Sequence, residues 1–543
     1  MPTRVSAPAR VFPGSLEQVP PDMRLPYYKD GARYLIDGRV RTWNGPCEEA
    51  VSPVCVGEGG SLRRHVLGRY PMMTAAEARE ALAAAQRAYD NGCGTWPTMS
   101  VADRIRHVEE FLPRVVAVRD EVVRLLMWEI GKTLPDARKE FDRTVDYIRD
   151  TIQALKELDR TSSRFAVEQG FVAQIRRSPL GVVLCMGPYN YPLNETFTTL
   201  IPALIMGNTV VFKPPKHGVL LHAPLLQAFA DSFPPGVVNT IYGAGRVVAG
   251  PLMESDGVQV LAFIGSAKVA ALLKHQHPQA NRLRCVLGLE AKNPAIVLPD
   301  ADLDLAVKEC TLGALSFNGQ RCTAIKIVFV HRSVAPDFCQ RLADAVGTLG
   351  VGMPWEEGVQ ITPLPEDDKP QWLKKLVDDA AAGGARVLNA GGGTIDQTLY
   401  YPAVLYPAQP EMEICQVEQF GPVLPVVPYD DEQEVVDWAV KSPVGQQASL
   451  FGGDARSLSR LIDTLVNQVC RVNINSQCQR GPDVFPFTGR KDSAEGTLSV
   501  SDALRVFSIR SLVAAKANEV NEAIVSEIVR GRHSNFLSTD FIF

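Results

Sequence analysis

Hydrophobic and polar positions along the chain change from a helical to a strand-like spacing near residue 180. Residues 75–89 and 104–128 carry apolar positions at the spacing of amphipathic helices. Before them, Asp37-Gly38 separates two short apolar runs, which predicts a β-hairpin. After residue 180, helix-length segments separate short apolar strands, the first at 181–186, 209–212 and 258–263. This alternation predicts βαβ units and a parallel sheet.

A second series of the same kind begins at residues 294–298 and continues through 325–330 toward 422–427. Two α/β domains are therefore predicted. The termini, roughly 1–30 and 512–543, carry less pattern. The final eight residues are too apolar for a solvated tail, so packing on a partner subunit is one expectation for them.

Composition narrows the class of protein. The chain has 543 residues, of which 46% are hydrophobic and 22% charged, as in an ordinary globular protein of two or three domains. A net charge of -5 argues against a nucleic-acid partner. The most apolar run, 200–212, is broken by Pro202 and Gly207 and is shorter than the roughly 20 residues of a membrane-spanning helix. No membrane partner is expected.

The eleven cysteines include no C-x-x-C pair, so neither a disulfide scaffold nor a metal site is predicted. A reducing compartment fits this pattern. The N-terminus lacks an apolar signal core, although two arginines precede the first acid, Glu17, which leaves organelle targeting as an alternative. A cytoplasmic location is the prediction.

Cys322 is the candidate nucleophile. It stands in the string F-N-G-Q-R-C-T at 317–323, a turn between an apolar helix-like run and the strand at 325–330. A thiol beside a guanidinium can ionise below its free pKa of about 8.5 and attack a carbonyl carbon. Most cysteines in soluble enzymes are instead small buried hydrophobes. The residues around Cys322 are therefore needed to distinguish a nucleophile from a buried core residue.

With Ala324, that string resembles the active-site signature of the aldehyde dehydrogenase superfamily. The Arg before the Cys is similar to the residue at this position in the non-phosphorylating glyceraldehyde-3-phosphate dehydrogenase branch of the superfamily. The resemblance covers roughly residues 30–512. It implies an α/β fold with a Rossmann-type cofactor domain, an α/β catalytic domain and a β oligomerisation arm, in a homodimer or homotetramer.

The domain boundaries predicted from this resemblance divide the chain into five parts. They are an N-terminal extension (1–30), a cofactor-binding domain (31–287, with part of the arm near 160–178), a catalytic domain (288–470), a return to the cofactor domain and arm (471–511) and a C-terminal tail (512–543).

The cofactor prediction begins at the strand 209–212, which ends in K-P-P-K. This resembles the family's Lys-Pro segment and implies that Lys213 contacts the adenosine ribose. The family often places an acid three residues later when it prefers NAD, because a carboxylate repels a 2′-phosphate. Here Lys216 stands there, which favours NADP, with NAD as the alternative.

Two further strings resemble cofactor segments of the family. F-I-G-S resembles an F-x-G-S turn and implies that Gly265 and Ser266 approach the pyrophosphate at a helix start. E-Q-F-G-P-V resembles E-x-F-G-P-V and implies that Glu418 binds the nicotinamide ribose, with Phe420 also at the cofactor. The glycines at 243–250 are spaced wrongly for G-x-G-x-x-G and favour a plain turn.

The loop P-Y-N-Y-P is similar to the family's P-x-N-[FY]-P loop. The resemblance implies that the Asn190 side chain and the backbone N–H of Cys322 stabilise the oxyanion formed when the thiolate adds to an aldehyde.

Three arginines and a tyrosine indicate the substrate. Positions that bind the substrate phosphate in the non-phosphorylating branch are matched by Arg143, Arg321, Arg480 and Tyr191. Charge-assisted, often bidentate contacts are what a dianionic phosphate requires. The resemblance implies oxidation of a phosphorylated aldehyde, glyceraldehyde-3-phosphate, to 3-phosphoglycerate through a cysteine thioester.

One departure concerns the general base. The family's E-L-G-G-K motif provides a Glu that activates water, whereas this chain has G-L-E-A-K, with Gly288 at that position. Glu290 would project from the same face of an extended segment, so it is a candidate for a displaced base; Lys292 could equally hold it in an ion pair. A coenzyme A-acylating enzyme and a catalytically silent member with a binding or structural role stay open as alternatives.

Overall fold

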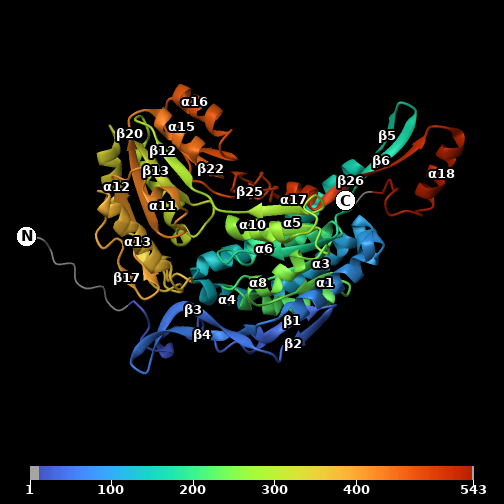
Figure 1. Ribbon diagram of the computed structural model, residues 1–543, viewed down its shortest axis with the longest axis horizontal. Helices are drawn as coiled ribbons and strands as arrows, with labels where there is room; N and C mark the ends of the chain where they lie inside the picture. The colour runs from blue at the N-terminus through green and yellow to red at the C-terminus, as the bar shows by residue number, and fades with distance from the viewer. Residues whose placement is uncertain (1–10, 541–543) are drawn as a thin grey trace, which may run out of the picture.

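Two twisted β-sheets organise the computed structural model, which describes residues 11–540 (Figure 1). Part of the predicted N-terminal extension, the proposed targeting signal within it, and the last three residues of the tail lie outside the described residues. Within 11–540, no helix is long and apolar enough to cross a membrane.

The first sheet has six strands in the order β25-β11-β10-β7-β8-β9. All pair in parallel except β25, which is antiparallel to β11. The strands are β7 (Val182–Met186), β8 (Thr209–Lys213), β9 (Val238–Thr240), β10 (Val260–Ile264), β11 (Arg284–Gly288) and β25 (Ala494–Glu495). Their almost continuous apolar composition fits a parallel sheet covered on both faces.

The strand order of this sheet reverses between β7 and β10, because the chain adds β8 and β9 on one side of β7 and then β10 and β11 on the other. Ligands of open parallel sheets bind outside the carboxyl ends of the strands at such a point. The loops that carry Asn190 and Gly265 follow β7 and β10, so both lie at this edge. The predicted βαβ pattern is confirmed.

The second sheet has the order β16-β19-β20-β13-β12-β22-β23, parallel except for the β16–β19 pair. Its strands are β12 (Asn293–Val297), β13 (Ile325–His331), β16 (Arg386–Val387), β19 (Ala403–Tyr406), β20 (Val423–Tyr429), β22 (Gln447–Phe451) and β23 (Arg471–Ile474). The chain passes from β11 to β12 through four residues, 289–292. This short link brings the amino ends of the second sheet toward the carboxyl ends of the first.

Helices surround both sheets, and α1 and α6 pack against β7 and β8. The longer helices are α1 (Ala75–Tyr89), α3 (Val101–Ala117), α4 (Arg119–Ile130), α5 (Leu134–Ser162), α6 (Asn194–Ile205), α10 (Ala267–Gln276), α11 (Leu303–Leu315), α12 (Ala335–Gly347), α13 (Lys369–Ala382), α15 (Glu432–Lys441) and α16 (Ala455–Leu465). Shorter elements are α2 (Thr95–Thr98), α7 (Leu226–Ser232), α8 (Gly245–Val248), α9 (Gly250–Met253), α14 (Glu413–Gln416), α17 (Val500–Val506), β14 (Gly350–Val351), β15 (Val359–Ile361), β17 (Ile395–Asp396), β18 (Leu399–Tyr400), β21 (Val444–Gly445) and β24 (Arg490–Lys491).

The prediction of a single helix over 104–128 is wrong, because the chain breaks at Val118 between α3 and α4. Val118 has φ -102° and ψ 15°, outside helical geometry. The first turn of α4 carries Asp120 and Glu121, and acids there interact favourably with a helix N-terminus. No Gly or Pro stands at the break, so this interruption of the helix could not be predicted from the local sequence.

The N-terminal strands include the predicted hairpin. β1 (Arg33–Ile36) pairs with β2 (Arg39–Thr42), and β3 (Cys47–Glu58) pairs with β4 (Ser61–Pro71). Asp37 and Gly38 between β1 and β2 both have positive φ, as a tight two-residue turn of this kind requires.

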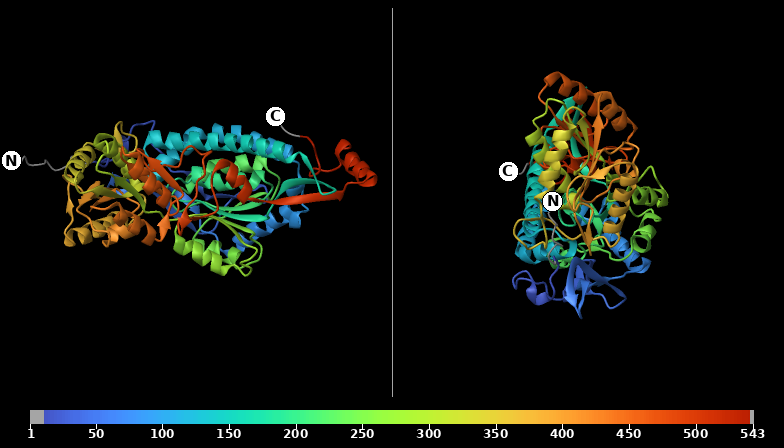
Figure 2. Two further views of the ribbon diagram at one scale, coloured as in Figure 1. Left: turned by 90° about the horizontal axis from the view of Figure 1, so that it is seen from above. Right: turned by 90° about the vertical axis from the view of Figure 1, so that its left-hand side faces the viewer.

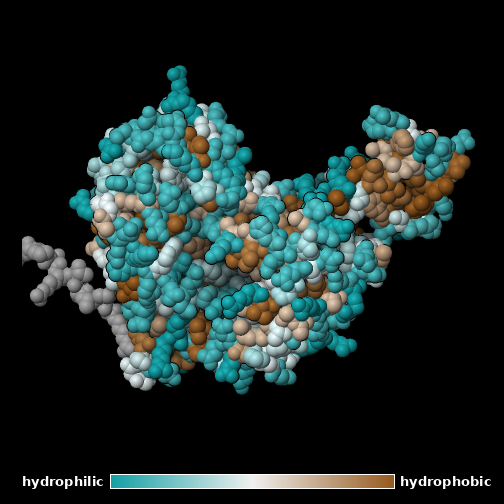
Figure 3. Space-filling model, in the orientation of Figure 1, coloured by the Kyte–Doolittle hydropathy of each residue, from teal (hydrophilic) through white to brown (hydrophobic). Residues whose placement is uncertain are grey.

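A three-stranded antiparallel arm extends away from the two sheets (Figures 1 and 2). It consists of β5 (Phe165–Glu168), β6 (Phe171–Pro179) and β26 (Ser508–Lys516), followed by α18 (Glu519–Arg530). Its role in oligomerisation remains a prediction. Apolar side chains such as those of Leu512, Val520 and Ile524 are more than half exposed, and Figure 3 shows the apolar surface of this region.

The C-terminal segment returns to its own chain after α18. Gln174 donates to Ser538 O at 2.7 Å, and Asn535 donates to Thr98 O at 2.8 Å, while Leu537 is buried. As far as residue 540, the tail therefore packs on the arm and body of its own chain, and its packing on a partner subunit stays a prediction.

Candidate active site

The Cys322 loop connects α11 to β13 through a short helical turn, Ser316–Gly319. Phe317, Asn318 and Gly319 all have positive φ. A Cβ at Gly319 would lie 2.7 Å from Ala314 O and 2.8 Å from Gly421 O, so only glycine fits this position. The positive φ angles and close backbone contacts of this turn thus explain the Asn-Gly pair at 318–319.

Hydrogen bonds from neighbouring elements fix the backbone of this loop. Asn293 of β12 and Lys326 of β13 donate to the Cys322 carbonyl at 2.8 and 3.1 Å. Lys326 also donates to Arg321 O at 2.6 Å, and the Asn318 side chain is bonded to both the backbone and the hydroxyl of Thr362. The position of the thiol is therefore determined by residues of the second sheet.

The Cys322 thiol is partly exposed to a cavity of about 440 Å³. Burial raises the pKa of the thiol, and the Glu195 carboxylate raises it further, while Lys326 and Arg480 act in the opposite direction. The prediction of a lowered pKa is wrong in this state, chiefly because the thiol is buried. Arg321, on which the prediction rested, instead donates from Nη2 to Gly313 O at 2.7 Å.

A pH dependence of thiol reactivity follows from this raised pKa. Because the thiolate is the nucleophile, the rate of Cys322 alkylation by iodoacetamide in the cofactor-free protein should still be rising above the pH at which an ordinary cysteine levels off. Mass spectrometry of the Cys322 peptide across pH 6–10 measures this. A plateau already at neutral pH would contradict the environment described here.

Asn190 lies against the Cys322 loop, as the resemblance implied. Its Nδ2 donates to Gln320 O at 2.8 Å, and its carbonyl accepts from Lys132 Nζ at 2.9 Å. An amide has two N–H donors, so one remains for a second partner. The side chain is buried, which fixes the direction of that donor.

The Asn190 loop is held by a buried ion pair that sequence reasoning missed. Lys132 pairs with Glu140, and its Nζ lies 3.6 Å from the centre of the Tyr191 ring. Glu140 also accepts from the backbone N–H groups of Leu193 and Asn194 at the start of α6, each at 3.1 Å. Burial lowers the pKa of Lys132. The sequence offered one indication of this pair, a lysine just after the apolar end of α4, because a buried charge requires a partner.

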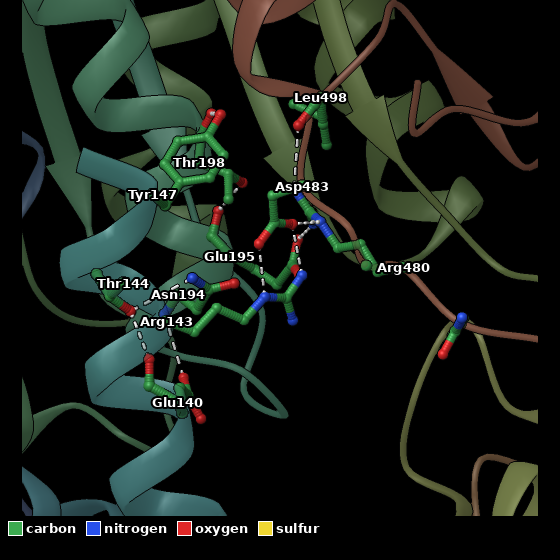
Figure 4. Close-up of polar contacts among 12 residues, drawn as sticks. Glu140, Arg143, Thr144, Tyr147, Asn194, Glu195, Thr198, Arg480, Asp483 and Leu498 are labelled. Carbon is green, nitrogen blue, oxygen red and sulfur yellow. Dashed lines mark hydrogen bonds and ion pairs between the residues drawn. The ribbon is translucent and has the colours of Figure 1, made fainter. Parts of the chain in front are cut away.

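Two of the three predicted phosphate-binding arginines converge on Asp483 (Figure 4). Arg143 of α5 makes a bidentate pair with Asp483 at 2.7 and 2.6 Å. Arg480 donates through Nε to Asp483 at 3.2 Å, through Nη2 to Leu498 O at 3.1 Å, and through Nη1 to Glu195. Despite burial, the two arginines hold the pKa of Asp483 below its usual range.

All four residues predicted to bind the substrate line the same cavity as Cys322: Arg143, Tyr191, Arg321 and Arg480. The sequence did not indicate that carboxylates would already engage two of the guanidinium groups. Glu195 could have been suspected, because it is an acid in a helix whose residues are otherwise apolar or uncharged, and that helix is buried throughout.

The segment around Gly288 differs from the expectation for Glu290. The Glu290 carboxylate accepts from Ala267 N at 2.7 Å, at the start of α10, and Glu290 is not among the residues that line the Cys322 cavity. Lys292 does not pair with it either, because Lys292 Nζ donates to Ile414 O and Gln419 Oε1, both at 2.6 Å. The proposed ion pair with Lys292 is therefore wrong, and the geometry gives no support to Glu290 as a base.

Gly288 itself is not required by the backbone. A Cβ there would meet its nearest atoms, on Ile264 and Leu498, at 3.5 Å and beyond, which is ordinary contact. Position 288 could therefore hold a side chain, and the missing carboxylate is not the consequence of crowding.

The adenosine end of the predicted cofactor site lies at the carboxyl ends of β8 and β10. Lys213 is half-buried and donates to Pro214 O at 3.1 Å, and desolvation lowers its pKa to about 8. Lys216 is exposed and pairs with Glu48 at 3.0 Å. Ser266 caps α10 and Gly265 N donates to Gly288 O at 3.0 Å. The backbone N–H at the start of α10 already donates to Glu290. The other groups at this edge of the sheet are suited to bind a dinucleotide.

The other end of that site reaches the Cys322 loop through Lys326. Glu418 accepts from Lys326 Nζ and from Ala291 N, both at 3.1 Å, and burial raises its pKa. Phe420 has a positive φ and its ring lies 5.7 Å from Lys326 Nζ. The structure thus brings Glu418 and Phe420 to the same lysine that holds the Cys322 carbonyl. Within residues 11–540, no cluster of metal-ligating side chains occurs.

Comparisons with known proteins agree with this geometry. The sequence model of the aldehyde dehydrogenase family matches residues 61–512, and the chain belongs to that family. The predicted α/β architecture and family are confirmed.

Among curated relatives, the NADP-dependent glyceraldehyde-3-phosphate dehydrogenase of Streptococcus equinus is 32% identical over 83% of this chain and 92% of its own length. A lactaldehyde dehydrogenase of Methanocaldococcus jannaschii is 27% identical over 83% of this chain and 95% of its own. Among solved structures, the NADP-dependent glyceraldehyde-3-phosphate dehydrogenase of Bacillus halodurans, complexed with NADP, superposes with a TM-score of 0.81 at 30% identity, covering 90% of this chain and all of its own.

Proposed function

We propose that this aldehyde dehydrogenase oxidises a phosphorylated aldehyde, glyceraldehyde-3-phosphate, to 3-phosphoglycerate with NADP. The observation that carries the proposal is the cavity in which Cys322 shares the walls with Arg143, Arg321 and Arg480. The Streptococcus equinus and Bacillus halodurans proteins named above, which carry this activity in their names, support it.

Cys322 is the proposed nucleophile, and its thiolate adds to the aldehyde carbon. The oxyanion that forms is stabilised by the second N–H of the Asn190 amide and by the backbone N–H of Cys322, because donors fixed in a buried site need no reorganisation during the reaction. The proposed cofactor contacts would hold NADP, which would supply the hydride acceptor for the tetrahedral adduct. Lys326 contributes by holding the Cys322 carbonyl and Glu418 in one arrangement.

Binding of the phosphate is assigned mainly to donors that the protein leaves unused. Arg143 uses Nε and Nη2 to bind Asp483, so its Nη1 is left for the phosphate. Arg321 lines the cavity and contributes positive charge, although its Nε is shielded from solvent and its Nη2 donates to Gly313 O. Arg480 contributes positive charge, while its Nη1 is paired with Glu195. Tyr191 packs over Lys132 and forms the adjoining wall.

NADP is assigned through Lys213 and Lys216 at the end of β8. Gly265, Ser266, Glu418 and Phe420 complete the proposed cofactor contacts. The arm supports a homodimer or homotetramer, and a cytoplasmic location remains part of the proposal.

The test is NADPH formation from glyceraldehyde-3-phosphate and NADP without inorganic phosphate or coenzyme A. Sustained turnover supports the hydrolytic enzyme. A single burst that continues only when coenzyme A is added would instead favour the acylating alternative, which the missing carboxylate at Gly288 makes a real competitor. Absence of NADPH with this and other aldehydes would favour the silent family member.

Replacing Lys216 with Glu should reverse the cofactor preference. The change puts a negative charge where the 2′-phosphate of NADP is proposed to lie, so kcat/KM for NADP should fall by about tenfold or more, equivalent to about 1.4 kcal/mol, while NAD is used at least as well as before. The matched control is Glu48→Gln, which frees Lys216 from its partner and should strengthen the preference for NADP. Equal losses with both cofactors would contradict the assignment.

A further inference from the structure

Glu195 brings a carboxylate into the cavity beside the thiol. It stands in the first turn of α6 and is 6% exposed. One oxygen, Oε2, is paired with Arg480. The other oxygen, Oε1, accepts no hydrogen bond from any residue within 11–540, although the residue lines the cavity. A free acceptor is therefore present on the substrate side of Cys322.

Two other carboxylates line this cavity, those of Glu140 and Asp136. Glu140 is bonded through both oxygens, to Lys132 and to two backbone N–H groups at the start of α6. Asp136 accepts from the Thr133 hydroxyl at 2.9 Å through Oδ2, and its Oδ1 accepts no hydrogen bond from residues 11–540. Asp136 is half-buried at the beginning of α5, so among the buried carboxylates of the cavity Glu195 is the one with an oxygen left for water.

The position of Glu195 relative to the thiol is reflected in the charges that act on Cys322. Glu195 exerts the largest charge effect on the thiol, ahead of Lys326, Arg480 and Glu418. Both residues line the same cavity, so the Glu195 carboxylate and the Cys322 thiol face a shared space. Glu290 is not among these charges, in agreement with its position at α10.

We propose that Glu195 is the general base for hydrolysis of the Cys322 thioester and replaces the carboxylate that position 288 lacks. This inference rests on the proposed function. The pairing of Oε2 with Arg480 holds the Glu195 side chain in place, while Oε1 stays free to bond a water molecule.

The step balances as an acyl transfer to water. A water molecule bonded to Oε1 gives a proton to Glu195 as its oxygen adds to the thioester carbon, and the Asn190 amide again stabilises the oxyanion. The C–S bond then breaks, the acid leaves and the electron pair remains on sulfur as thiolate. The proton on Glu195 passes to solvent through the cavity. No oxidant or further reactant is needed.

The decisive variant is Glu195→Gln, which preserves the shape and a hydrogen bond to Arg480 and removes the basic oxygen. In stopped-flow experiments with glyceraldehyde-3-phosphate and NADP, the first NADPH burst should remain, while steady turnover falls by about 10²-fold or more, the usual contribution of a general base. The acyl-enzyme should accumulate, be visible by mass spectrometry on Cys322, and be released by added hydroxylamine. Glu195→Asp, which retains a carboxylate, should recover part of the turnover.

Asp483→Asn is the matched control, because it also removes a carboxylate partner of Arg480. This variant should raise KM for the aldehyde. The ratio of the NADPH burst to the steady turnover should stay the same as in the unmodified enzyme. If Glu195→Gln behaves like Asp483→Asn, Glu195 only positions Arg480 and the proposal is overturned. Unchanged turnover in Glu195→Gln also overturns it.

Two further measurements keep the inference separate from the proposed function. Gly288→Glu in the Glu195→Gln protein should restore turnover, since position 288 has room for a side chain. Glu195→Gln should also speed alkylation of Cys322 by iodoacetamide at neutral pH, because a charge that opposes the thiolate is lost; no acceleration would contradict the proximity of the two groups. Absence of a burst from the unmodified enzyme would instead refute the proposed function, and this inference with it.

Discussion

Replacement of Cys322 by Ala is expected to remove both the NADPH burst and steady turnover, with a loss on the order of 10⁴-fold or more, as is usual when a catalytic nucleophile is deleted. Within residues 11–540, no other cysteine lines the arginine-lined cavity, so no second thiol there can take its place. The measurement is stopped-flow absorbance of NADPH with glyceraldehyde-3-phosphate.

The control for this experiment is Cys93→Ala, which removes an exposed cysteine remote from the cavity. That variant should retain the activity of the unmodified protein. Substantial NADPH formation by the Cys322→Ala protein would mean that a different group forms the covalent intermediate or that none is formed.

Asn190→Ala has the second largest expected effect, a loss of about 10²- to 10³-fold in kcat with little change in KM. The lost N–H acts on charge that develops only in the transition state, so substrate binding should be almost unaffected. Asn190→Asp keeps the shape and places a negative charge beside the oxyanion, so it should be at least as inactive. The measurement is a steady-state titration with the aldehyde at saturating NADP.

Structural damage can be separated from this catalytic effect. The Asn190 backbone carbonyl, which binds Lys132, is unchanged in both variants, and only the side-chain bond to Gln320 O is lost. Thermal unfolding should therefore change by the equivalent of one hydrogen bond, about 1 kcal/mol. A loss confined to KM, or a large drop in the unfolding temperature, would count against the oxyanion role.

The arginine-rich cavity has consequences for the choice of substrate. Because Asp483 and Glu195 already engage Arg143 and Arg480, a phosphate must bind to the remaining donors or displace a carboxylate. Arg143 Nη1, which Asp483 does not engage, favours the first route. Glu195 then stays beside the thiol throughout the reaction, which is the position that a hydrolytic base needs.

The alternation of strands and helices, the Asp37-Gly38 hairpin and the strings around Cys322 and Asn190 are all encoded locally in the sequence. Apolar periodicity and turn chemistry encode these features within a few residues, so no distant contact is needed to predict them. The same local view missed the break at Val118, where no Gly or Pro marks it and the two helices are each stabilised by packing.

The electrostatics of the site depend on the tertiary structure. Arg480 meets Glu195 across 285 positions of sequence, and Arg143 meets Asp483 across 340. Nothing local to any of these residues specifies its partner. Whether a charged group is free, paired or buried depends on chain segments that folding brings together, and burial above all reversed the expected direction of the Cys322 pKa. The sequence thus predicted the reacting groups, whereas folding set their charge environment.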